Sequence, residues 1–341
     1  MSTMLQQPGP WEPAAAPRLG FVGVGWIGRH RMESLAASGA GRVAAIADTS
    51  AERLAEAAAV VPDAVRMPLL ADVLEMELDG IVVATPSALH AQQCIRALEA
   101  GVAVFCQKPL ARTAEETRTV VAAARAADRL LGVDLSYRHT AAMQAVRRLV
   151  RDGDIGNVYA ADLTFHNAYG PDGGWARDPA LSGGGCVIDL GTHLVDLALW
   201  VLDFPQVRSV HGQRYARGQR LLATAAECED YAVATIELAS GAVVRVACSW
   251  ESSTGRDAVI EATFTGSAGS AAMRNVDGSF YDFVAEHCTG TSAITVASPP
   301  DDWGGRALEQ WARRLATGQR YDPDIEHVIT VATTLDGVLG R

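Results

Sequence analysis

Short apolar runs alternate with longer segments of helical period through the first third of the chain. The runs are continuous, as in strands that helices cover on both faces, and they lie at 18–23, 42–47, 80–84, 102–106 and 130–134, with a weaker one near Val65. Helical segments lie between them at 26–38, 51–59, 88–100 and 114–128. This alternation predicts a parallel sheet with helices on both faces. Thr113 and Glu116 form a capping box that starts the fourth helix.

After residue 138 the pattern becomes β-rich and alternating. One amphipathic helix is expected at 141–151, and runs that alternate apolar and polar residues follow at 158–166, 231–238, 242–250, 258–265 and 271–275. Alternation predicts an antiparallel sheet with one face exposed to water or to a partner. A final helix is expected at 324–339. We therefore predict a loose tail at 1–17, an α/β domain at 18–138 and an α+β domain at 139–341.

Composition narrows the classes of protein to which the chain could belong. Its 341 residues suffice for about two domains. A net charge of −11 argues against partners such as nucleic acid or an anionic membrane surface. Because no apolar run reaches the roughly 18 to 20 residues of a membrane span and no signal peptide is visible, we expect a soluble, cytoplasmic protein. The six cysteines form no C-x-x-C pair and are expected to be free, reduced thiols.

A glycine motif, Gly23-Val24-Gly25-Trp26-Ile27-Gly28, stands where the first strand ends and the first helix begins. The motif also occurs by chance, so its setting carries the argument. Here Gly23 permits a tight turn, Gly25 lets the backbone approach a pyrophosphate, and Gly28 allows close packing of the helix. The first helical turn, with Trp26 and Ile27, offers free N–H groups to phosphates. We predict a dinucleotide-binding site of the Rossmann type.

Asp48 supplies the acid that such a site needs at the end of its second strand, 20 positions after Gly28. A carboxylate there accepts hydrogen bonds from ribose hydroxyls and repels a 2′-phosphate. Thr49 and Ser50 provide no arginine that would reverse this preference, so NAD is expected, with NADP as the alternative. In the purely structural interpretation, Asp48 only caps the following helix.

Lys108 follows the apolar run at 102–106 and precedes Pro109. The carboxyl ends of strands in an open α/β sheet face the ligand, so Lys108 would lie beside the nicotinamide. Pro109 restricts Lys108 to an extended backbone, and a cis bond between them would aim the amine into the cleft. The alternative is a solvated charge at the end of a strand.

Three glycines, Gly183 to Gly185, open an apolar helix that carries Asp189, His193 and Asp196. Asp189 and His193, at i and i+4, share one face of the helix, and Asp196 falls near it. An imidazole beside a carboxylate suits removal of a hydroxyl proton. The structural alternative is an acid at a helix start and a histidine in the core. A metal is not expected because no further His or Cys cluster is placed to help, nor is a serine hydrolase, since no G-x-S-x-G elbow follows a strand.

Together these motifs resemble the Gfo/Idh/MocA (glucose-fructose oxidoreductase, inositol dehydrogenase, rhizopine catabolism) family of nicotinamide-dependent oxidoreductases. The resemblance covers nearly the whole chain from Arg18. It rests on four motifs in matching order, which are Gly23 to Gly28, Ala84-Thr85-Pro86-Ser87-Ala88-Leu89-His90, Gln107-Lys108-Pro109, and Gly183-Gly184-Gly185 followed by Asp189, His193 and Asp196.

The resemblance implies an α/β Rossmann domain followed by an α+β domain with a large open, mainly antiparallel sheet. The active site would lie between the domains, and the sheet would hold a homodimer or homotetramer together. Lys108, Asp189 and His193 would be catalytic and would also contact the substrate.

The resemblance also implies further contacts to the two ligands. Cofactor contacts would include Thr85, His90, Gln107 and Lys108, with His90 otherwise interpreted as a histidine that packs a helix. The substrate side would include Trp175, Arg177, Asp178-Pro179, Arg138, His166, Asn167 and Tyr169.

Two residues bear on how far the family pattern applies. Gln107 stands where the family usually has glutamate, so the charge balance of Lys108 would depend more on Asp189. Some members share this glutamine, and we do not interpret it as loss of activity. His193 is retained where glucose-fructose oxidoreductase-like members carry tyrosine, which favours a dehydrogenase with exchangeable cofactor.

We therefore expect hydride transfer between a secondary alcohol of a sugar or cyclitol and NAD(P). His193 would take the hydroxyl proton, Lys108 would stabilise the charge that develops on oxygen, and Asp189 would orient the amine or the hydroxyl. A keto-sugar reductase and an NAD-dependent glycosidase that oxidises its substrate transiently are the alternative enzymes. A redox-sensing binding module is the alternative without catalysis.

Overall fold

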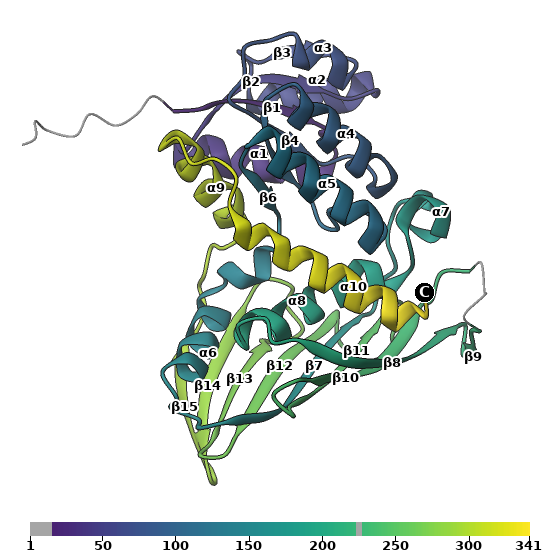
Figure 1. Ribbon diagram of the computed structural model, residues 1–341, viewed down its shortest axis with the longest axis vertical. Coiled ribbons are helices and arrows are strands. Elements are labelled where there is room, and N and C mark those ends of the chain that lie inside the picture. The colour runs from purple at the N-terminus through teal and green to yellow at the C-terminus, as the bar shows by residue number, and fades with distance from the viewer. Residues whose placement is uncertain (1–15, 223–226) are drawn as a thin grey trace, which may run out of the picture.

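The computed structural model describes residues 16–222 and 227–341. All but the last two residues of the predicted tail at 1–17 lie outside these ranges. Figure 1 shows a first sheet with helices on both faces and a second, larger sheet with helices on one face. The predicted succession of a Rossmann-type α/β domain and an α+β domain with a mainly antiparallel sheet is confirmed.

Six parallel strands form the first sheet in the order β3-β2-β1-β4-β5-β6. They are β1 (Arg18–Val22), β2 (Arg42–Ala47), β3 (Val65–Met67), β4 (Gly80–Val83), β5 (Ala103–Cys106) and β6 (Leu131–Val133). Every residue of β4 and β5 is buried, which explains why their apolar runs are continuous. The strand order reverses between β1 and β4, so the carboxyl ends of these strands open a crevice for a ligand.

Five helices connect these strands. They are α1 (Trp26–Ser38), α2 (Ala51–Val60), α3 (Leu70–Leu74), α4 (Ser87–Glu99) and α5 (Ala114–Ala127). Helix α5 starts as predicted, because the Thr113 hydroxyl accepts the N–H of Glu116 at 3.1 Å. The Glu116 carboxylate accepts the N–H of Arg112 at 3.0 Å, so the second half of the capping box is displaced by one residue.

Nine strands form the second sheet in the order β15-β14-β13-β12-β7-β11-β10-β8-β9. They are β7 (Val158–Asn167), β8 (Val207–Ala216), β9 (Gln219–Arg220), β10 (Tyr231–Leu238), β11 (Val243–Ser249), β12 (Ala258–Gly266), β13 (Ser270–Asn275), β14 (Phe283–Thr289) and β15 (Ser292–Ala297). Among the described strands of this sheet, only β7 and β11 pair in parallel. Strands β8, β9, β14 and β15 are absent from the sequence prediction. In β15 no residue is buried, and in β8 only Arg214 and Ala216 are, so no apolar alternation marks these two strands.

Helices cover one face of the second sheet (Figure 1). They include α6 (Ala141–Arg151), α8 (Thr192–Val201) and α10 (His327–Leu339), which is preceded by the 3-10 turn η4 (Pro323–Glu326). The stretch 179–201 is long and apolar enough to cross a membrane, but 94% of its most apolar window is buried inside the protein. Every residue of α8 is buried, which identifies it as the central helix of this domain.

The unpredicted helix α9 (Arg306–Ala316) crosses the proposed domain division. Its Leu308 and Trp311 belong to the hydrophobic core of the first sheet, together with Leu19 and Phe105. Residue 138 lies between the last strand of the first sheet and the first strand of the second, and α9, from the later part of the chain, packs against the first sheet. The return of α9 to the first domain joins the two domains through a second connection.

The six cysteines are unpaired thiols, as predicted. Cys94, Cys106, Cys186 and Cys248 are buried. Burial raises the pKa of Cys186 well above its ordinary value, which keeps this thiol protonated and unreactive.

Candidate active site

A cleft with a volume of about 1080 Å³ lies between the two domains. The first domain lines it with the glycine loop and with residues at the carboxyl ends of its strands. The second domain lines it with β7, the loop around Trp175, the helical turn η3 (Val187–Gly191), α8 and residues 280–304. The cleft thus lies where open α/β sheets place their ligands.

Two of the three glycines in the loop, Gly23 and Gly28, leave no room for a side chain, whereas the third, Gly25, faces open space. Gly23 has a φ of +85°, and a Cβ there would lie 2.6 Å from the carbonyl of Ala84. A Cβ on Gly28 would lie 2.2 Å from the carbonyl oxygen of Gly23. A Cβ on Gly25 would meet, among the described residues, only a nitrogen of Arg53 at 4.0 Å. Packing therefore does not require Gly25, and the space before it, next to the uncapped first turn of α1, fits the pyrophosphate of a dinucleotide.

Asp48 lies beside the glycine loop at this end of the cleft. Its carboxylate accepts the N–H groups of Val24 at 3.0 Å and Ser50 at 2.9 Å. Ser50, not Asp48, is the N-cap residue of α2. Arg53, in the first turn of α2, also lines this end of the cleft and supplies the arginine that Thr49 and Ser50 do not. The helix brings Arg53 back to the strand end, and this proximity is not visible in the residues directly after Asp48.

Lys108 is the only lysine in the sequence, since every other residue among the 29 basic ones is arginine. The Lys108–Pro109 bond is cis. The ammonium crosses to the second domain and donates to both the carboxylate and the backbone carbonyl of Asp189, each at 2.7 Å. Trp250 Nε1 donates to the other carboxylate oxygen at 2.9 Å. An ion pair supported by an indole therefore joins the two domains in the cleft.

The Asp189 carboxylate is ionised in this arrangement. Burial by itself would raise its pKa, but the charge of Lys108 and the hydrogen bonds from Lys108 and Trp250 outweigh burial and lower the pKa of Asp189. The side chain of Asp189 remains 38% exposed and that of Lys108 20%. Both groups are thus accessible to a ligand in the cleft.

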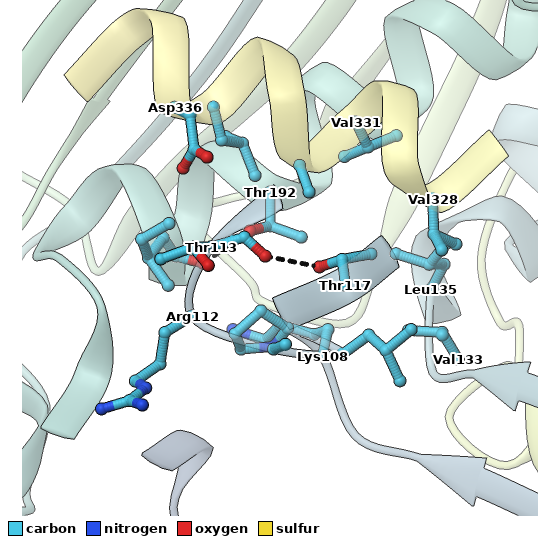
Figure 2. A pocket seen from close by; sticks show the side chains of 16 residues that line it. Lys108, Arg112, Thr113, Thr117, Val133, Leu135, Thr192, Val328, Val331 and Asp336 are labelled. Carbon is cyan, nitrogen blue, oxygen red and sulfur yellow. Dashed lines mark hydrogen bonds between the residues drawn. The ribbon is translucent and has the colours of Figure 1, made fainter. Parts of the chain in front are cut away.

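A smaller, mainly apolar cavity adjoins Lys108 (Figure 2). Its walls include Leu135 and, from α10, Val328 and Val331. Thr117 closes one side, with its hydroxyl donating to the Thr113 carbonyl at 2.8 Å. Lys108 lines both this cavity and the cleft, so it lies between the two spaces.

The helix that carries Asp189 and His193 begins with a π-helical turn. This turn, η3, is followed directly by α8. The predicted uninterrupted α-helix is therefore wrong at this point, because the wider turn changes the angle between successive side chains. Asp189 and His193 nevertheless both line the cleft. Turns of this kind recur at functional sites.

His193 packs against Tyr137, with ring centroids 4.6 Å apart. Burial, followed by the positive charge of Lys108, lowers the pKa of His193 well below its ordinary value, although Asp189 opposes the shift. The imidazole is therefore neutral near pH 7, and a neutral imidazole can accept a proton.

Glu229, which the sequence analysis missed, holds the start of this helix. Its carboxylate accepts the N–H groups of Gly185 at 2.8 Å and Val187 at 3.0 Å, and it is 1% exposed. A Cβ on Gly185 would lie 2.0 Å from the carbonyl oxygen of Glu229. Gly185 is thus required because the backbone of Glu229 approaches it closely. Glu229 lies 44 positions further along the chain, and its neighbours in the sequence do not indicate this role.

Arg138 and Asp196 lie outside the lining of the cleft. The Arg138 guanidinium forms two hydrogen bonds with the Asp196 carboxylate, including Nε to Oδ2 at 2.7 Å. It also lies over the ring of Phe204, 5.4 Å from its centroid. Asp196 is 2% exposed, on the core side of α8. The structure corrects both the expected substrate contact of Arg138 and the shared face of Asp189 and Asp196, because this pair fastens the 3-10 turn η1 (Ser136–His139) to α8.

The expected substrate-side residues separate into two groups. Trp175, in the 3-10 turn η2 (Gly174–Arg177) before α7 (Pro179–Ser182), and Asn167 line the cleft. His166, Tyr169 and Arg177 are engaged outside its lining, in the pairs His166–Ser249, Tyr169–Asp257 and Arg177–Glu251. Asp178 and Pro179 begin α7, where the Asp178 carboxylate accepts the N–H of Ala180 at 2.9 Å. Tyr137, Phe280, Tyr281 and Trp303, which were not predicted from the sequence, add aromatic side chains to the lining.

Thr85, His90 and Gln107 line the part of the cleft that the first domain forms. The two ring nitrogens of His90 each lie 2.7 Å from a carbonyl oxygen, one of Thr85 and one of Pro109, and the residue is 1% exposed. His90 thus ties the loop after β4 to the loop after Lys108. Within residues 16–222 and 227–341, no three His, Cys, Asp or Glu residues are grouped so that they could hold a metal ion.

Comparison with known families agrees with this geometry. A model described as "Oxidoreductase family, NAD-binding Rossmann fold" matches residues 17–135, and one for the GFO/IDH/MocA C-terminal domain matches residues 143–272. The chain belongs to the Gfo/Idh/MocA family of oxidoreductases. The resemblance found in the motifs is thereby confirmed, as is the NAD-binding class of the first domain.

The names of several similar proteins refer to reactions on sugars. The chain is 29% identical to a D-glucoside 3-dehydrogenase of Escherichia coli K12 over 59% of this chain and 60% of that protein. It is 33% identical to a 1,5-anhydro-D-fructose reductase of Ensifer adhaerens over 54% of this chain and 56% of that protein. These matches span less than two thirds of the length of either relative. A levoglucosan dehydrogenase solved with NADH and levoglucosan has the same fold, with a TM-score of 0.81 at 21% identity over 95% of this chain and 96% of that one.

Proposed function

We propose that the protein is an NAD(P)-dependent oxidoreductase that transfers hydride between a secondary alcohol of a neutral sugar or cyclitol and the nicotinamide. The observation that carries this proposal is the Lys108–Asp189 ion pair, which shares one cleft with the neutral His193 and with an open glycine loop. Acid, base and dinucleotide site thus face a single space.

The cofactor would extend from the glycine loop to Lys108. Gly25 and the first turn of α1 would hold the pyrophosphate, and Asp48 would accept hydrogen bonds from the hydroxyls of the adenosine ribose. Arg53, at the same end of the cleft, would pair with a 2′-phosphate. Thr85 and Gln107 would adjoin the nicotinamide half. When bound, the nicotinamide supplies the acceptor or donor of hydride.

The protein's own groups would handle the proton. In the oxidation direction the alcohol carbon loses hydride and its oxygen loses a proton, and His193 receives that proton because its imidazole is neutral. Lys108 would donate a hydrogen bond to the same oxygen and stabilise the negative charge that develops on it. Asp189 would keep the ammonium in position through the two contacts at 2.7 Å.

A neutral substrate is favoured by the walls of the cleft and by the charge of the chain. Trp175 and Tyr281, which are 39% and 54% exposed, offer aromatic surface to a sugar ring, while Asp172 adds a carboxylate to the lining. The net charge of −11 also disfavours phosphorylated or acidic sugars. Names of related proteins, such as the glucoside dehydrogenase and the levoglucosan dehydrogenase, support a sugar.

Two alternative reactions use the same residues. A keto-sugar reductase would run the reaction in reverse, with the imidazolium of His193 returning the proton, and the name of the 1,5-anhydro-D-fructose reductase favours this direction. An NAD-dependent glycosidase would oxidise and re-reduce its substrate without net change in the cofactor. We place the enzyme in the cytoplasm.

We also propose a homodimer or homotetramer through the open face of the second sheet. This face carries small and β-branched side chains such as Ala247, Val259 and Thr263, with Tyr231 38% exposed at its side. Light scattering of the purified protein tests this assembly, and a monomer at micromolar concentration would contradict it.

A substrate screen tests the proposed function. Purified protein is mixed with NAD or NADP and a panel of neutral sugars, glycosides and cyclitols, and with their keto forms and NADH, while the absorbance of the reduced cofactor is followed. We expect turnover with a neutral compound and none with its phosphate ester. Tight NADH binding without turnover on the whole panel would instead favour the redox-sensing module, and released aglycone without net NADH would favour the glycosidase.

A further inference from the structure

Three buried side chains meet next to the catalytic lysine. Arg31 comes from α1, Gln107 directly follows β5, and Asp134 directly follows β6. The Arg31 Nε donates to Asp134 Oδ2 at 2.5 Å, and the Gln107 amide nitrogen donates to the same oxygen. Asp134 is 1% exposed, and Arg31 and Gln107 are each 6% exposed. Two donors from separate elements therefore share one carboxylate oxygen.

The group contains one positive charge, on Arg31, and one negative charge, on Asp134, and these balance only while residue 107 is neutral. Arg31 and Asp134 form a buried ion pair, and such a pair is stable only when its geometry and hydrogen bonds are complete. The second oxygen of Asp134 has no hydrogen-bond partner among the described residues, so the Gln107 amide is one of just two donors to this carboxylate there. A glutamate at position 107 would replace that donor with a second carboxylate against the same oxygen, and like charges at this distance repel.

The group also connects the two parts of the cleft. Arg31 lies on α1 three residues after Gly28, the last glycine of the loop. Gln107 is the immediate neighbour of Lys108. Asp134 holds both, so the helix that opens at the glycine loop and the backbone that carries the ammonium are fixed to one buried carboxylate.

We propose that Arg31, Asp134 and Gln107 form a positioning network for Lys108. Asp134 supplies the buried negative charge at this site, which requires residue 107 to be a neutral donor. The network sets the backbone of Lys108 relative to the glycine loop, and through it the direction of the ammonium. The role of Lys108 rests on the proposed function, whereas the network itself can be tested without turnover.

A reciprocal exchange of acid and amide tests the network. Gln107→Glu places two carboxylates together, and Asp134→Asn leaves Arg31 without its charged partner. The double variant Gln107→Glu/Asp134→Asn restores one acid, one amide and one guanidinium. We expect each single variant to lose on the order of tenfold or more in kcat/KM, and the double variant to recover most of that loss. Gln319→Glu, at an exposed position, controls for one added negative charge.

The single lysine provides a readout that does not depend on activity. Protein labelled biosynthetically with lysine that carries ¹³C only at Cε gives one labelled side-chain NMR signal, that of Lys108. We expect Gln107→Glu and Asp134→Asn to shift this signal and to weaken NADH binding measured by fluorescence, and the double variant to return both toward the wild-type values. These shifts would be observed even if the proposed function were wrong and no substrate were turned over.

Each outcome of these measurements supports or overturns the positioning network. A Gln107→Glu variant with wild-type NMR signal and NADH affinity would overturn the network, as would a double variant whose losses equal the sum of the two single losses. If Gln107→Glu fails to fold while the double variant folds, the proposal is supported, because the double variant contains the same substitution. If neither folds while Asp134→Asn does, the compensation is absent and the proposal is overturned.

Discussion

The two ends of the cleft are built in different ways. The glycine end is local, since its loop occupies residues 23–28 and leaves open space where a ligand fits. The reaction end depends on contacts between distant residues, with Lys108 and Asp189 81 positions apart and Asp189 and Trp250 61 apart. Its charges are already paired in the protein. The glycine end is therefore a preformed space for a ligand, whereas the reaction end is a hydrogen-bonded network of residues from several parts of the chain.

The largest expected effect on stability separates two glycines of the same loop. Gly28→Ala should destabilise the protein by about 3 kcal/mol or more, because its Cβ would lie 2.2 Å from a carbonyl oxygen. Gly25→Ala should fold normally, since its φ of −64° suits any residue, but should weaken NADH binding by roughly tenfold or more. Urea unfolding and fluorescence titration measure the two effects. Equal stability of the two variants would contradict the distinction between packing and ligand space.

The reaction end should respond to a residue that contacts no ligand. Glu229→Gln removes the charged acceptor of the Gly185 and Val187 N–H groups, so it should cost about 2 to 3 kcal/mol of stability and lower kcat as the helix start loosens. The matched change Glu227→Gln, at an exposed ion pair with Arg217, should cost less than about 1 kcal/mol. Similar urea midpoints for both variants would show that Glu229 does not hold the helix.

The pH dependence of oxidation should report the neutral state of His193. Because the pKa of His193 lies well below its ordinary value of 6.5, the imidazole stays unprotonated as pH falls through 6.5. The acid limb of kcat/KM should therefore lie well below pH 6.5, with activity lost only when the base takes up a proton before the substrate binds. His193→Gln should remove most of the activity at all pH values. A wild-type acid limb centred above pH 6.5 would contradict this assignment.

The smallest expected effect concerns the choice between NAD and NADP. Arg53 is exposed and lies beside Asp48 at the cofactor end. Arg53→Ala should weaken NADP binding by roughly fivefold, in line with about 1 kcal/mol for an exposed charge contact. NAD binding should change by less than about twofold. Equal changes for both cofactors would remove Arg53 from the recognition of a 2′-phosphate.

The same contrast explains how much the sequence could predict. The strands of the first sheet, the capped start of α5 and the glycine loop follow from local patterns, because adjacent residues determine them. Glu229, Trp250 and Asp134 gave no local signal, since their roles arise from contacts with distant residues. Arg138 and Asp196 were misplaced because their ion pair joins residues 58 positions apart. Helix α9 is amphipathic, with Leu308 and Trp311 on its buried side, so its own pattern could have predicted it.

The central claim is that Lys108 acts on the reacting oxygen rather than in binding the cofactor. Its most direct test is a single-turnover experiment in which enzyme already saturated with NAD is mixed rapidly with a substrate found in the screen. Lys108→Met should form NADH on the order of a thousandfold more slowly than wild type, as expected when a preorganised donor to the developing charge is lost. Its affinity for NADH should stay within about twofold, because the cofactor is held mainly from the glycine end. Equal rates of NADH formation in the two proteins would contradict the account.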